Sequence, residues 1–100
     1  HASDDAFRRA LREAQVEAQR LIEATQSALQ DAGELLSTLE RAHVDAAVSR
    51  LQAVMIGDDR RAIDAAMQAL GSATNEFAAR RMNRSVQRAL SGRRIDQLSP

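Results

Sequence analysis

The stretch "AFRRALREAQVEAQRLIEATQSALQDAG", residues 6–33, decides the fold of this chain. Apolar side chains recur along it at steps of three and four residues, which places them in one stripe on one face of an α-helix. Asp4 and Asp5 suit the positive end of a helix dipole, and Gly33 is a residue that ends helices. The pattern therefore predicts a helix over residues 4–32, roughly 43 Å long at ~1.5 Å per residue.

Two further helices are expected downstream. Ser37 and Glu40 match the capping-box pattern, which predicts a helix over residues 38–56 that ends at Gly57. Asp58-Asp59 then offers the cap for a helix over residues 59–81. The last two helices are each roughly 30 Å long if they span about 20 residues. Because short connections force neighbouring helices to run antiparallel, the expected fold is a bundle.

The apolar positions after Phe77 are rotated by roughly 90° from those before it, at ~100° per residue. The third helix is therefore expected either to bend near residues 78–83 or to change the neighbour it contacts. Asn83 and Ser85 could cap a new helix over residues 83–91, and Gly92 would end it. Residues 92–100 are expected to form a tail.

The fold class is thus predicted to be all-α: an antiparallel three-helix bundle with a long first helix and a short fourth C-terminal helical segment. The predicted bundle core consists of Leu21, Ile22, Leu29, Val44, Val48, Leu51, Ile63, Met67, Leu70 and Phe77. Met82, Val86 and Leu90 are predicted to pack the C-terminal segment against the rest.

The composition narrows the class of protein. The 100 residues predict one small domain, and 20 of them are alanine, which favours helix. Cysteine is absent, which excludes disulfides and cysteine-based zinc sites. No apolar run reaches the ~18 residues of a membrane span. A reducing compartment, the cytoplasm, is the expected location.

The charges are balanced in total but unevenly placed. Residues 1–76 hold eight arginines and thirteen acids, whereas residues 77–100 hold six arginines and one acid. Arg80, Arg84 and Arg88 step by four along one helical face. The favoured interpretation is that these arginines lie over acids of neighbouring helices or are solvated. Nucleic-acid binding through the basic face Arg80–Arg94 is a weaker alternative, because the total charge is zero and no aromatic side chain is interleaved to stack bases.

The first helix is predicted to be longer than the two that pack against it. Its opening turns would then project beyond the bundle with apolar residues on their surface. Exposing a Phe or Leu forfeits ~1.5–3 kcal/mol relative to burial, so a partner is expected to cover them. The predicted contact or self-association surface is Phe7, Ala10, Leu11 and Ala14. Two explanations fit such an exposed stripe: the chain forms a homodimer through it, or the chain is a fragment of a larger protein whose other part covers it.

No catalytic constellation is visible in the sequence. His1 and His43 are far apart and match no metal-ligand spacing. The paired carboxylates stand at expected helix starts, where capping explains them better than acid–base chemistry. The chain is therefore expected to lack enzymatic activity, resident cofactors and metals.

Two motifs resemble a known family. "GDDRRAIDAAMQAL" (residues 57–70) and "NEFAARRMNRSVQRALSG" (residues 75–92) are similar to the C-terminal end of HscA-type chaperones, a branch of the DnaK family. Residues 13–51 resemble the long helix and following turn of DnaK-type lids. The resemblance spans roughly residues 4–96. An asparagine stands at position 83, where the family tends to carry an acid, and the chain continues beyond Asp96.

The resemblance implies a helical lid that covers client peptide on a β-sandwich subdomain of the same protein. It also implies a role in iron–sulfur cluster assembly, with a scaffold client of the IscU type and a co-chaperone of the HscB type. ATP and Mg²⁺ would bind a domain outside these residues. The alternative from another class is a free-standing helical adaptor that binds an amphipathic helix of a partner.

Overall fold

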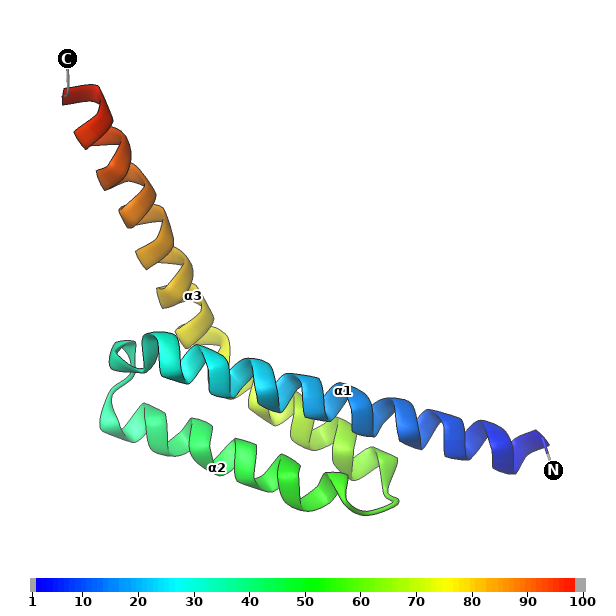
Figure 1. Cartoon of the computed structure of the whole chain (residues 1–100). Coiled ribbons are helices and arrows are strands. Elements are labelled where there is room, and N and C mark those ends of the chain that lie inside the picture. Colours follow the sequence, from blue (N-terminus) through cyan, green and yellow to red (C-terminus); the bar gives the residue numbers. More distant parts are fainter. Residues whose placement is uncertain (1, 99–100) are drawn as a thin grey trace.

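The computed structural model describes residues 2–98, with side chains for residues 3–92, and shows three helices (Figure 1). Helix α1 spans Ala2–Ala32 and is followed by a short 3₁₀ turn, η1, at Gly33–Leu35. Helix α2 spans Thr38–Met55, and α3 spans Arg60–Leu98. The molecule is elongated, with extents of 71 × 31 × 17 Å. The prediction of an all-α chain with a long first helix is confirmed within the described residues.

Local capping explains where α2 and α3 begin. The Ser37 hydroxyl accepts a hydrogen bond from the Glu40 backbone amide, while the Glu40 carboxylate accepts one from the Ser37 amide, which completes the predicted capping box. An Asp59 carboxylate oxygen accepts a 3.2 Å hydrogen bond from the amide of Ala62. These side chains satisfy amide groups that have no partner within the helix.

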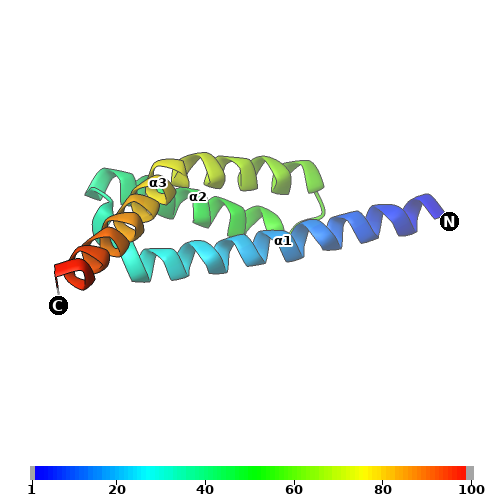
Figure 2. The same cartoon turned by 90° about the horizontal axis from the view of Figure 1, so that it is seen from above.

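The hydrophobic core lies between the three helices, where α2 runs back beside α1 and the first half of α3 runs beside both (Figures 1 and 2). Of the predicted core, Leu21 and Met67 are partly buried against this cluster. The other predicted core residues are buried: Ile22, Leu29, Val44, Val48, Leu51, Ile63, Leu70 and Phe77. Four alanines of α1 are also buried, and their small side chains allow the helices to approach closely.

Helix α3 differs from the prediction. The short fourth helix over residues 83–91 and the tail from residue 92 are wrong, because one helix continues through both to Leu98. Asn83 and Ser85 lie inside this helix and start no new one, and Gly92 does not end it. The predicted tail residues 99 and 100 lie outside the described part of the chain.

The axis of α3 nevertheless changes direction, at its yellow section in Figures 1 and 2. In this region the hydroxyl of Thr74 donates to the carbonyl oxygens of Leu70 and Gly71, at 2.9 and 3.2 Å. Hydroxyl groups that bond back to the preceding turn bend helices, and a Gly-Ser pair such as Gly71-Ser72 is a common position for a kink. The bend thus precedes the predicted residues 78–83.

The second half of α3 projects away from α1 and α2 (Figure 1). Three apolar side chains are exposed on this projection: Met82 at 69%, Val86 at 51% and Leu90 at 53%. Their predicted packing against the rest of the chain is therefore wrong. The rotation of the apolar stripe does mark a change of surroundings, but the stripe faces solvent.

Candidate interaction surface

The point at which α1 leaves the bundle is marked by Gln15. Its side-chain amide donates hydrogen bonds to the carbonyl oxygens of Met55 and Gly57, at 3.1 and 3.2 Å. These carbonyls lie at the end of α2, where the helix itself supplies no partner. Residues before Gln15 therefore extend along and past the connection between α2 and α3, as the blue end of α1 shows in Figure 2.

The predicted contact surface lies at this projecting end. Phe7 is 56% exposed, and Ala10 and Leu11 are half-buried, with Leu11 packed against the edge of the core. Ala14 is buried at 5% exposure, so its predicted place on the outward surface is wrong. Ala14 points into the bundle because it lies within one turn of Gln15, where α1 meets the other helices.

A shallow hollow surrounds Phe7. It is lined by Phe7, by Asp58 and Asp59 of the connection between α2 and α3, and by Arg60, Arg61 and Asp64 at the start of α3. The aromatic ring thus lies beside three carboxylates and two guanidinium groups, and Arg60 pairs with Asp64 at 3.6 Å. This end of α1 therefore offers a partner apolar contact area beside charged groups of both signs.

The arginines of α3 explain how its projecting half is held. The Arg80 guanidinium donates to both carboxylate oxygens of Glu40, each at 2.8 Å, and to the carbonyl oxygen of Leu35 at 2.9 Å. The Glu40 carboxylate thus has two roles, because it caps the start of α2 and also binds Arg80 of α3. We call this set of contacts, together with those of Arg84 below, the arginine clamp.

Arg84 extends the clamp by one helical turn. Its guanidinium pairs with Glu34 and lies 3.9 Å from a carboxylate oxygen of Asp31. Arg81 instead lies over the ring of Phe77, 5.7 Å from the ring centre, in a cation–π arrangement. The interpretation that these arginines lie over acids of neighbouring elements is confirmed for Arg80 and Arg84. Both side chains are thereby less available to phosphates.

The clamp shifts the protonation of its members. Hydrogen bonds from Arg80 and from the Ser37 backbone lower the pKa of Glu40 from 4.5 to about 2. Glu40 in turn raises the pKa of Arg80. The pKa of Glu34 is lowered by its own backbone amide and by Arg84. The ionised carboxylates are therefore the forms that the folded chain stabilises.

Glu40→Gln tests the charge of the clamp, because glutamine can keep the capping box. The folded pKa of about 2 is below the ordinary 4.5, so the stabilisation from Glu40 is present above pH 4.5 and is lost as pH falls toward 2. We expect a small drop in Tm at neutral pH that narrows over this window. Thermal melts by circular dichroism between pH 2 and 7 measure it. Arg80→Met should flatten the pH dependence similarly, and steep profiles in both variants would contradict the assignment.

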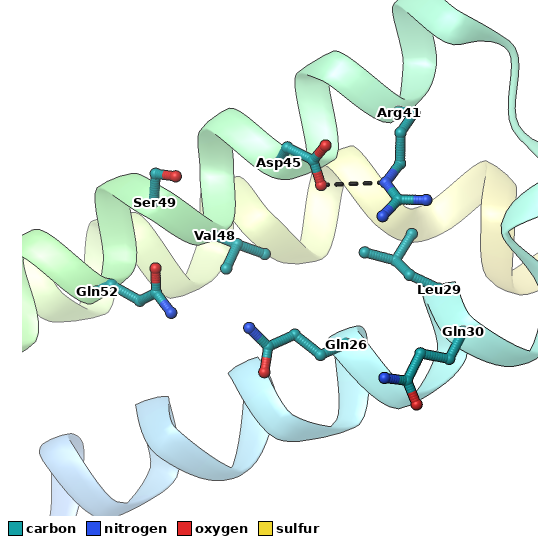
Figure 3. Close-up of a pocket in the computed structure, with 8 residues that line it drawn as sticks. All are labelled: Gln26, Leu29, Gln30, Arg41, Asp45, Val48, Ser49 and Gln52. Carbon is teal, nitrogen blue, oxygen red and sulfur yellow. Dashed lines mark hydrogen bonds and ion pairs between the residues drawn. The ribbon is translucent and has the colours of Figure 1, made fainter.

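A groove between α1 and α2 was not predicted from the sequence. Figure 3 shows Gln26 and Gln30 of α1 facing Ser49 and Gln52 of α2 across it, with an Arg41–Asp45 ion pair of 3.1 Å at one end. Leu29 and Val48 form its floor. The four-residue step from Gln26 to Gln30 was the available signal. The groove offers amides and hydroxyls for hydrogen bonding and contains no nucleophile paired with a base.

Other candidate chemistry is sparse in the described part of the chain. No group of three or more His, Cys, Asp or Glu side chains that could hold a metal ion occurs among residues 3–92, whose side chains the structure describes. His43 is exposed on α2 and belongs to no such group. None of the described helices is long and apolar enough to cross a membrane.

The fold defines an all-helical module in the described residues. The chain is 59% identical to an HscA-homologue chaperone of Burkholderia multivorans and 61% identical to that of Burkholderia cenocepacia, each over 97 residues and 97% of this chain. The homologue from Burkholderia thailandensis is 59% identical over the same length. No protein-family model matches the chain. The chain is a homologue of HscA-type chaperones over the part of them that it spans, which confirms the resemblance in residues 57–92.

The match covers nearly the whole chain but little of each relative. The aligned segment amounts to 16% of the length of these chaperones. The relation therefore applies to a helical segment of an HscA-type protein.

Proposed function

We propose that this chain is the lid of the peptide-binding domain of an HscA-type chaperone and covers a bound client peptide. The observation that carries this proposal is the identity of 59–61% over 97% of the chain to HscA homologues. A lid needs no catalytic residues, since it acts by slowing the release of what it covers. Its opening and closing are a shift in population between two arrangements.

The projecting end of α1 supports this role. Phe7 is 56% exposed on turns that extend beyond the Gln15 anchor. A lid must present such a surface to the subdomain that holds the peptide. Phe7, Ala10 and Leu11 are therefore the proposed contacts with the β-sandwich. Two copies of the isolated chain could pair through the same residues.

The wider role is part of the same proposal. The chaperone would act in the cytoplasm on a scaffold client of the IscU type during iron–sulfur cluster assembly. An HscB-type co-chaperone and ATP with Mg²⁺ would act through domains outside these residues. This chain would lengthen the time for which the client stays bound and would catalyse no reaction.

The test uses the chaperone in which this chain is joined to its nucleotide-binding and peptide-binding domains. Phe7→Asp should speed the release of a fluorescent client peptide in the ADP state by roughly tenfold or more. Losing burial of a Phe costs ~1.5–3 kcal/mol, and each ~1.4 kcal/mol is a factor of ten. Stopped-flow anisotropy measures the release rate.

Leu39→Asp is the matched control, because Leu39 is 70% exposed on α2 and lies far along the bundle from Phe7. It should leave peptide release unchanged. If Phe7→Asp released the peptide at the unmodified rate, the contact role of this surface would be refuted. If removal of all three helices also left release unchanged, the lid function itself would be refuted.

A further inference from the structure

The projecting half of α3 has an apolar face of its own. Met82, Val86 and Leu90 are each more than half exposed. Three exposed alanines lie around them, and at ~100° per residue all six fall within roughly 120° of the helix circumference. We call this set the outer face: Ala78, Ala79, Met82, Val86, Ala89 and Leu90.

The arginine clamp directs the outer face away from the bundle. Arg80 contacts Glu40, and Arg84 contacts Glu34. Both arginines lie roughly opposite Met82 on the helix, at ~100° per residue. Because the clamped side faces α1 and α2, the outer face points away from them, and Figure 1 shows this half of α3 standing apart.

The two edges of the outer face differ in charge. Arg81 and Arg88 lie beyond one edge, where Arg81 also contacts the ring of Phe77 and the charge of Arg88 helps to lower the pKa of Glu34. Asn83 and Gln87 follow the other edge. No acidic residue occurs between Glu76 and Asp96, so the arginine edge has no carboxylate on its own helix segment. The surface therefore combines an apolar stripe with one positive edge and one neutral polar edge.

We propose that the outer face binds an amphipathic helix of another protein, whose apolar stripe carries acidic side chains along one edge. Alanines allow two helix backbones to approach, and Met82, Val86 and Leu90 supply contact area at four-residue spacing. Acids opposite Arg81 and Arg88 would set the orientation of the bound helix. This inference concerns α3 and does not depend on the lid role of α1.

Two other occupants fit less well. A membrane surface favours aromatic anchors and several unpaired basic residues, whereas residues 78–92 contain no aromatic residue and the clamp already pairs Arg80 and Arg84. A second copy of α3 in antiparallel orientation would bring the two arginine edges together. In parallel orientation it would offer only amides to Arg81 and Arg88. Neither arrangement supplies an acid.

The test uses two fluorescent helical peptides with the same leucine stripe, one with glutamates and the other with lysines along one edge. Each is titrated with the 100-residue chain in low salt, and anisotropy reports binding. The glutamate peptide should bind at least tenfold more tightly than the lysine peptide. Added salt should reduce this difference, because exposed charges are screened.

Val86→Asp should weaken binding of the glutamate peptide at least tenfold. Ile56→Asp is the matched control, since Ile56 is 84% exposed at the end of α2, and it should bind as the unmodified chain does. The double variant Arg81→Gln/Arg88→Gln should retain weak binding but lose the preference between the peptides. Circular dichroism should show all variants folded, because none of the four side chains is fully buried.

Three results would overturn the proposal. The first is equal or absent binding of the two peptides. The second is binding to vesicles of phosphatidylserine and phosphatidylcholine without binding to the glutamate peptide, which would make the face a membrane contact. The third is a dimer in light scattering that Val86→Asp disperses, which would show that a second copy covers the face.

Discussion

Phe77→Ala should destabilise the chain by about 3–5 kcal/mol, a large part of the ~5–15 kcal/mol typical of a small domain. Phe77 is 2% exposed and belongs to the core, and the guanidinium of Arg81 lies 5.7 Å from its ring centre. Truncation removes the buried ring, leaves a cavity and ends the cation–π contact. Because the chain has no Trp or Tyr, urea unfolding is best followed by far-UV circular dichroism.

Phe7→Ala is the matched control, since these are the two aromatic residues of the chain. Phe7 is 56% exposed, so its removal should change the free energy of unfolding by about 0.5 kcal/mol or less. Similar losses in both variants would show that Phe7 is covered in solution, by this chain or by a second copy. Light scattering of the unmodified chain then separates these two explanations.

The contrast between the two phenylalanines also shows what could be predicted from the sequence. Residue periodicity identified the helices and most of the core, because a stripe at three- and four-residue steps must lie on one face. The capping box of Ser37 and Glu40 was equally visible, since it depends on residues three apart. These features are local, and local spacing determines them.

Apart from Ala14 of α1, the errors concern α3, where local signals competed. Asn83, Ser85 and Gly92 are common at helix ends, yet within a helix each costs at most about 1 kcal/mol relative to alanine. Surrounding helix formers outweigh that cost, so the helix continues to Leu98. The exposure of Met82 could not be predicted either, because a stripe shows which residues share a face but not whether another element covers it.

The ion pairs of the arginine clamp could not be predicted from the sequence, because their partners are far apart along the chain. Arg80 and Glu40 are 40 residues apart, and Arg84 and Glu34 are 50 apart. The excess of arginine in residues 77–100 indicated that acids elsewhere could pair with it. Which acids do so depends on the bend of α3 near Thr74, which sets the path of the helix over the α1–α2 connection.

Leu51→Ala should destabilise the chain by about 2–5 kcal/mol. Leu51 is 0% exposed on α2, at the centre of a core in which α1 contributes mainly alanines. Few large side chains are available there to move into the space, so the cavity should persist. At roughly 4–8 °C of Tm per kcal/mol for a domain of this size, the melting temperature should fall by roughly 8–40 °C.

Leu39→Ala makes the same chemical change on the same helix, with Leu39 70% exposed. Both substitutions replace one strong helix former by another, so helix propensity contributes little to the difference between them. The difference in unfolding free energy lost by Leu51→Ala and by Leu39→Ala therefore reports how deeply each leucine side chain is buried. If Leu39→Ala lowered Tm as much as Leu51→Ala, the side of α2 that faces the core would be assigned wrongly, because a helix that buries Leu51, Val48 and Val44 cannot also bury Leu39 on the opposite part of its first turn.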